Sequence, residues 1–130
     1  MKRLGQKYAW TISDMNTIIP SPSLSRNVTE KQAVATFSVP ETDITMAKLI
    51  LSPGWHWKKD VGHLTGQDHC MLTHDGYCIS GSLIVKDADG NRTTISAGDF
   101  FHIPPKHDGW VNGIDDFVSI EVRKAGNGTR

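Results

Sequence analysis

From about residue 34 onward, short β-prone runs alternate with glycine, proline, aspartate and asparagine. These breakers recur every 8–12 residues or so, roughly the spacing of a β-sandwich or β-barrel. No helical periodicity of about 11 residues or more interrupts this region, so an alternating β/α architecture is disfavoured. The pattern therefore predicts an all-β domain. Its expected strands are Val34–Val39, Thr45–Leu51, Gly76–Lys86, Arg92–Ser96, Phe100–Ile103, Trp110–Asn112 and Phe117–Arg123.

One turn in this region carries a specific signal. Asp89-Gly90 lies between the runs Leu83–Lys86 and Arg92–Ile95. Tight hairpin turns need positive φ angles, and glycine adopts them without strain. We therefore expect a β-hairpin with Asp89-Gly90 at its tip.

The chain has 130 residues, which suits one domain. The first part is weakly patterned, and Pro20 and Pro22 favour an extended loop there. The expected organisation is an N-terminal extension over residues 1–33, a barrel domain over residues 34–124 and a flexible tail over residues 125–130.

Charge and cysteine content narrow the range of partners and compartments. Lysine and arginine number 14, as do aspartate and glutamate, so the formal net charge is zero with neutral histidines. A surface for nucleic acid or anionic membrane would need a basic excess, so neither partner is expected. Cys70 and Cys78 form no disulfide framework or CxxC motif, and no signal peptide or membrane-spanning run is visible. The expected location is the cytoplasm.

Two stretches resemble the motifs of the cupin superfamily. In the first cupin motif, five residues separate a glycine from His-x-His and six residues separate a later glutamate from a second glycine, and Gly54 and Gly81 match those two glycines. The second motif begins with a glycine and a proline separated by five residues, and Gly98 and Pro104 match both. The resemblance implies a double-stranded β-helix, or jelly roll, as the fold.

The sequence also resembles a group of small bacterial cupins. Their Pro-Gly-Trp-x-Trp, His-x-Gly-Tyr-x-x-Ser-Gly and Pro-Pro-Gly-His-Asp-x-Trp elements correspond to residues 53–57, 74–81 and 104–110. The departures are Lys106, which stands where this group has glycine, and the residue before Trp110. The resemblance covers about residues 45–122. It predicts the fold of the chain but does not specify a reaction.

The metal motif of the family is degenerate in this chain. Where cupins carry His, His, Glu and His, this sequence has Asp60, Gly62, His74 and Gly109. The segment between Gly62 and His74 is also much longer than in the motif, at 11 residues. Two of the four positions therefore offer no side chain to a metal.

Four residues remain as candidate metal ligands: Asp60, Cys70, His74 and His107. Imidazole is the commonest metal ligand. Cys70 would share a face with His74 if the chain between them is extended, and His107 would share one with the vacant position at Gly109. This mixture of nitrogen, sulfur and oxygen suits a divalent zinc or iron ion. The alternative is that His74 is a polar residue at the barrel mouth, that His107 caps a loop through Asp108 and that Cys70 is a buried, inert thiol.

The remaining aromatic residues and histidines are divided between pocket, core and surface. Trp57, Tyr77, Phe101 and Trp110 are expected to line a ligand pocket with His74 and His107, although they could equally form the core. His56, His63 and His69 lie in a polar segment and are expected at the surface.

The sequence leaves three functions open. The first is a cupin that binds a small molecule in a pocket inside the barrel, with or without a metal. The second is a metal-dependent enzyme, such as an oxygenase, isomerase or lyase acting on a small organic acid. The third is a structural or interaction module. A homodimer is expected in each case, with Val34–Val39 as the contributing sheet edge, because open edges are often covered by a partner.

Overall fold

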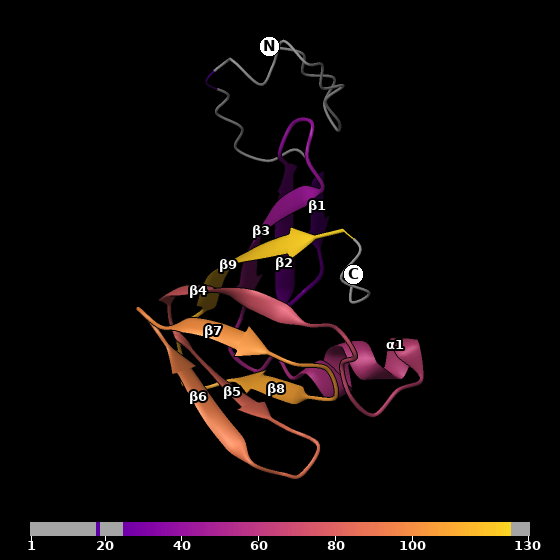
Figure 1. Cartoon of the computed structure of the whole chain (residues 1–130). Coiled ribbons are helices and arrows are strands. Elements are labelled where there is room, and N and C mark those ends of the chain that lie inside the picture. Colours follow the sequence, from indigo (N-terminus) through magenta and orange to yellow (C-terminus); the bar gives the residue numbers. More distant parts are fainter. Residues whose placement is uncertain (1–17, 19–24, 126–130) are drawn as a thin grey trace.

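The structure, a computed structural model, describes Ile18 and residues 25–125 (Figure 1). Most of the predicted N-terminal extension, and all but the first residue of the predicted tail, lie outside these residues. The described part is built mainly from antiparallel strands, which confirms the all-β prediction. The strands are β1 (Ser25–Val28), β2 (Gln32–Ser38), β3 (Ile44–Leu51), β4 (His74–Ser80), β5 (Ser82–Lys86), β6 (Arg92–Ser96), β7 (Phe100–Ile103), β8 (Asp108–Val111) and β9 (Phe117–Lys124).

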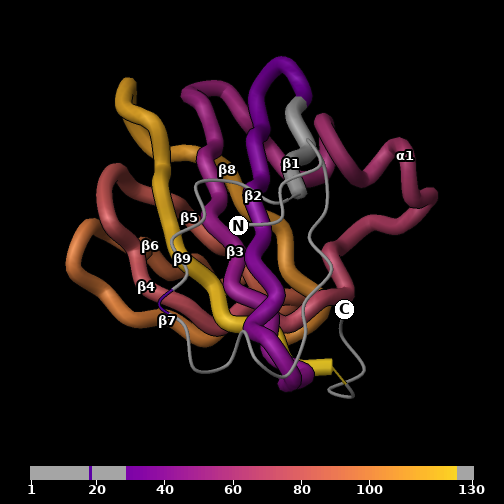
Figure 2. The backbone as a smooth tube through the Cα atoms, turned by 90° about the horizontal axis from the view of Figure 1, so that it is seen from above, coloured from indigo at the N-terminus to yellow at the C-terminus, as the bar shows by residue number. Residues whose placement is uncertain are grey.

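The strands form two sheets that enclose a common interior. The larger sheet has the order β1-β2-β3-β9-β4-β7, and the smaller has the order β6-β5-β8. From above, β9, β3 and β2 lie side by side over the smaller sheet (Figure 2). Buried residues of both sheets form one apolar cluster, to which β3 and β9 supply Leu51 and Phe117, and β5 and β8 supply Leu83, Val85 and Val111. The molecule therefore has the two-layered architecture of a jelly-roll barrel.

The predicted hairpin is present between β5 and β6. Gly90 has a φ of 88°, and its N–H donates to the carbonyl of Asp87 at 3.0 Å. The two strands pair in register from Ser82–Ser96 to Lys86–Arg92. The turn signal in the sequence is confirmed.

The run predicted as one strand over Gly76–Lys86 is divided at Gly81. Residues before it belong to β4 in the large sheet, and residues after it belong to β5 in the small sheet. Gly81 has a φ of 79°, and a Cβ at this position would lie 2.1 Å from the carbonyl oxygen of Asp116. Only glycine allows the chain to cross between the sheets this close to another backbone segment.

The prediction that Val34–Val39 forms a sheet edge is wrong. These residues fall mostly in β2, which pairs with β1 on one side and β3 on the other. The outer strands of the large sheet are β1 and β7.

The segment between β3 and β4 contains the helical part of the described chain. It consists of a π-helical turn, η2 (Lys58–Gly62), followed by a single turn, α1 (His63–Thr65). A Cβ on Gly62 would lie 2.9 Å from the Trp57 ring, so glycine lets this segment pack closely on the tryptophan. Within the described residues, neither helix has the length and apolar character needed to cross a membrane.

Candidate functional site

A cavity of about 330 Å³ lies inside the barrel, between the two sheets. Its walls are largely apolar, and a small group of ionisable side chains projects into it. The ionisable group consists of Cys70, His74, His107, Glu121 and Arg123. The apolar walls include Leu49, Leu51, Trp55, Trp57, Val61, Leu83, Val85, Phe101, Ile103 and Phe117. A concave apolar site with a few convergent polar groups is typical of small-molecule binding.

Backbone hydrogen bonds hold Cys70 beside His107. The Cys70 N–H donates to the His107 carbonyl at 2.7 Å, and the His107 N–H donates to the Cys70 carbonyl at 3.2 Å. The Lys106 N–H donates to the same Cys70 carbonyl at 2.8 Å. Lys106 adopts a φ of 69°, in the left-handed region, at the turn that precedes His107. Two segments far apart in the sequence are thereby joined at the cavity wall.

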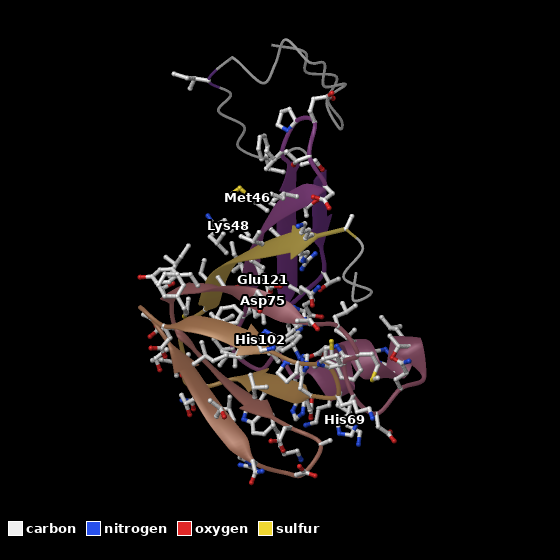
Figure 3. All side chains as sticks on the ribbon, viewed as in Figure 1. Met46, Lys48, His69, Asp75, His102 and Glu121 are labelled. Atoms are coloured by element: carbon white, nitrogen blue, oxygen red, sulfur yellow. The ribbon has the colours of Figure 1, made fainter. Side chains whose placement is uncertain are left out.

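His74 begins β4, and β9 orients its ring. Its Nδ1–H donates to the Glu121 carboxylate, with Nδ1 and Oε1 2.8 Å apart. Its Nε2 lies 3.6 Å from the Cys70 sulfur. Glu121 is only 2% exposed and lies inside the barrel on β9 (Figure 3). A buried carboxylate therefore fixes which ring nitrogen of His74 faces the cysteine.

His107 is oriented by the main chain instead. Its Nδ1 lies 2.6 Å from the Pro104 carbonyl oxygen, which can only accept a hydrogen bond. Nδ1 therefore carries a proton, which leaves Nε2 as the ring nitrogen that could act as a ligand. The ring centroids of His107 and His74 are 5.2 Å apart. The two rings are therefore close enough for one ion to join both.

The site favours the ionised form of Cys70. Burial opposes ionisation, but hydrogen bonds from His107 and His74 outweigh it and lower the pKa of the Cys70 thiol to about 6. Burial also opposes the charge on His74, but its hydrogen bonds to Cys70 and Glu121 raise the pKa of this imidazole to about 9. Cys70 and His74 therefore form a thiolate–imidazolium pair near neutral pH.

Three of the four predicted metal ligands converge. The ligand atoms of Cys70, His74 and His107 all lie within 4.8 Å of one another. Asp60 does not join them. Its carboxylate accepts from the His56 N–H at 2.8 Å and lies 3.6 Å from the Lys31 ammonium, within the helical segment.

The four predicted aromatic residues are divided between the two faces of the barrel wall. Trp57 and Phe101 line the cavity. Tyr77 and Trp110 do not: Tyr77 packs against Phe100 outside the large sheet, with ring centroids 4.8 Å apart. Trp110 is enclosed between His56 and Arg92, 5.1 Å from the His56 ring and 5.0 Å from the guanidinium.

Sequence reasoning missed Glu121 and Arg123, and it misplaced His56. Phe117, Ser119 and Glu121 are buried on one face of β9, while Val118 and Ile120 lie on the other. The only signal is that a glutamate follows Phe117 at an even spacing. His56 is partly buried, and its Nε2 lies 2.7 Å from the carboxylate of buried Asp108.

No protein-family model matches the sequence, and no curated protein sequence is similar to it. Solved structures are similar at the level of fold. A cupin-like protein from Thermotoga maritima is 14% identical, with a TM-score of 0.53, over 78% of this chain and 77% of that one. Ectoine synthase from P. lautus is 12% identical, with a TM-score of 0.54, over 76% and 67%. KdgF from a Halomonas species is 17% identical, with a TM-score of 0.53, over 76% and 86%. The chain therefore has the cupin fold.

Proposed function

We propose that this chain is a cupin that binds a divalent metal ion through Cys70, His74 and His107, and a small molecule beside it in the barrel cavity. The observation that carries the proposal is the convergence of three ligand atoms within 4.8 Å at the wall of an apolar cavity. The Cys70–His74 separation of 3.6 Å matches the roughly 3.5 Å expected when both bind one tetrahedral ion at about 2.3 Å and 2.0 Å. The three ligand atoms lie within 4.8 Å of one another. This limit is wider than the roughly 3.5 Å expected around one tetrahedral ion, so we expect the histidine rings to rotate slightly when the ion binds.

The groups behind the ligands support a metal site. Metal-binding histidines usually donate their other N–H to a carboxylate or a backbone carbonyl. His74 donates to the Glu121 carboxylate and His107 to the Pro104 carbonyl, so Nε2 of each ring would face the ion, which would displace the proton that His74 carries there. Cys70 is a free thiol that ionises readily. A free thiol ligand also suits a reducing compartment such as the cytoplasm.

Three protein ligands leave room for another group on the ion. Catalytic zinc sites commonly have three protein ligands and one open position, whereas structural sites are closed. Bound here, a zinc or iron ion would supply Lewis-acid chemistry toward the cavity. Trp57 and Phe101 would pack on the ligand and restrict the access of water. An enzymatic role remains the alternative to binding alone.

Elemental analysis of tag-free protein tests the metal proposal. We expect about one zinc or iron ion per chain, and loss of most of it in Cys70→Ala and in His107→Ala. His102→Ala is the matched control because that side chain is 66% exposed, on the outer face of the large sheet. Wild-type protein that takes up no metal after equilibration with zinc or iron would sink the proposal, as would equal loss of metal in His102→Ala.

We further propose that two copies associate through the outer face of the large sheet. Large apolar side chains from β3, β4, β7 and β9 are exposed there: Met46, Tyr77, Ile79, Phe100 and Val122. The exposed pair Asp75–His102, labelled in Figure 3, joins β4 and β7 on the same face. Contiguous apolar patches of this kind mark protein–protein contacts. The zero net charge of the chain means that two copies do not repel each other.

Light scattering at micromolar concentration tests the dimer. The wild type should have twice the mass of one chain, and Phe100→Glu should reduce it to that of a monomer. Ile114→Glu is the matched control because Ile114 is 90% exposed in the turn before β9, away from this face. A monomeric wild type would contradict the proposal.

A further inference from the structure

Arg123 is a cation at the cavity that the metal proposal does not use. It follows Glu121 by two residues on β9, and its side chain is 27% exposed. Its guanidinium lies 3.6 Å from the Glu121 carboxylate, beyond the length of a normal hydrogen bond. Glu121 directs its shorter bond to His74, at 2.8 Å. Arg123 pairs with Thr45 through the backbone of the sheet, but its guanidinium makes no hydrogen bond to the described residues, so its side-chain N–H donors are available to a ligand.

Arg123 lies between two cavities. A second cavity of about 290 Å³ adjoins the barrel interior. Leu72, His74 and Arg123 line both cavities and form their shared wall. The rest of the second cavity is lined by Asp43, Thr45, Thr73 and Ala125. The Arg123 guanidinium and the His74 imidazole therefore lie where the two cavities adjoin.

The charges at the shared wall favour an anion. With a divalent ion bound, two positive charges on the ion and one on Arg123 face the Cys70 thiolate and the Glu121 carboxylate. One positive charge then remains uncompensated in a mostly apolar cavity, where electrostatic interactions are stronger than in water. A ligand with a single negative charge would neutralise it. Asp43 lines only the second cavity.

We infer that Arg123 is the residue that recognises the ligand, and that the ligand is a small monocarboxylate with an apolar body. The planar guanidinium matches a carboxylate in a paired hydrogen-bond geometry. Trp57, Phe101 and Phe117 provide the apolar surface for the rest of the molecule. The inference rests on the proposed function, since it assigns the ligand class and the specificity residue of the same cavity.

Titration with benzoate and benzamide tests the inference, because the two differ chiefly in the carboxylate. Binding is followed by the fluorescence of Trp55 and Trp57, both in the cavity wall, in metal-free and in cobalt-loaded protein. Benzoate should bind more tightly than benzamide. Arg123→Gln should weaken benzoate binding about 10–100-fold, the equivalent of one or two charged hydrogen bonds. It should leave benzamide binding and the cobalt absorption spectrum unchanged.

Two further variants complete the experiment. Lys124→Gln removes the same charge from the exposed neighbour of Arg123 and should change nothing. Arg123→Lys keeps the charge and should retain part of the affinity. The inference is overturned if wild type does not prefer benzoate to benzamide, or if Arg123→Gln binds benzoate normally. If wild type binds no cobalt while metal-free protein still binds benzoate through Arg123, the metal site fails and the carboxylate inference stands.

Discussion

Replacing Glu121 with glutamine isolates the contribution of a buried group that never touches the proposed ion. The substitution keeps the size of the side chain but converts a charged hydrogen bond to His74, 2.8 Å long, into a neutral one. Hydrogen bonds to charged groups contribute roughly 1.5–3 kcal/mol and neutral ones roughly 0.5–1.5 kcal/mol, a difference of about 1–1.5 kcal/mol. That difference corresponds to about tenfold in zinc affinity. It lies within the range of about 10–100-fold known for groups that orient metal ligands.

The assay is competition for zinc against a chromophoric chelator, with circular dichroism as a check on the fold. The matched control is Asp75→Asn, which removes the charge from the other histidine–carboxylate pair, the exposed Asp75–His102 pair outside the large sheet. We expect the zinc affinity of Glu121→Gln to fall about tenfold and that of Asp75→Asn to remain at the wild-type value. Unchanged zinc affinity in Glu121→Gln would refute the assignment of Glu121 as the group that orients His74.

Three other predictions follow from the turns and from the ionised pair. Lys106→Gly should raise the free energy of unfolding in urea by about 0.5–1 kcal/mol. The left-handed φ costs lysine about 1–2 kcal/mol, and the greater entropy of glycine in the unfolded chain cancels only part of that gain. A loss of stability would contradict this. Gly81→Ala should lower the free energy of unfolding in urea by more than about 1 kcal/mol, since its Cβ meets the Asp116 carbonyl. Gly90→Ala, with open space around the Cβ, should lower it by less. In chelator-treated protein, thiolate absorbance should titrate with a midpoint near 6. The stabilisation by the pair should decline as the pH falls through about 6, where Cys70 gains a proton, and as it rises through about 9, where His74 loses one. A midpoint near 9 for the thiol would contradict the proposed pair.

The strands were predictable because the breakers that separate them have local physical effects. Proline and glycine act on their own φ angles, so Gly90 and Gly98 mark turns in the sequence as well as in the structure. The split at Gly81 was not predictable. Nothing in the sequence shows that the Asp116 backbone approaches that glycine so closely.

Within the site, residues at even spacing on one strand were placed more reliably than residues in a loop. His107 and Gly109 both line the cavity, as their two-residue spacing implies. The same alternation puts Tyr77 on the face opposite His74 and Trp110 on the face opposite Gly109, so neither should have been expected inside. Asp60 lies in a π-helical turn, and the 11 residues between Gly62 and His74 remove any fixed relation to the later strands. Glu121 was hidden because its face of β9 also carries Ser119 and Arg123, whereas the opposite face carries Val118, Ile120 and Val122, so the alternation points to the wrong face as the buried one.

The backbone hydrogen bonds between Cys70 and His107 reduce the conformational entropy that the chain would lose on binding a metal. Those hydrogen bonds form between main-chain groups, so they hold two ligands together whether or not an ion is present. In a zinc finger the ligands come together only when the metal binds, so the free energy of metal binding drives the folding of the chain. Here much of that conformational entropy is lost when the barrel itself folds. Metal removal should therefore lower the melting temperature while leaving the barrel folded, and reloading should need no refolding step.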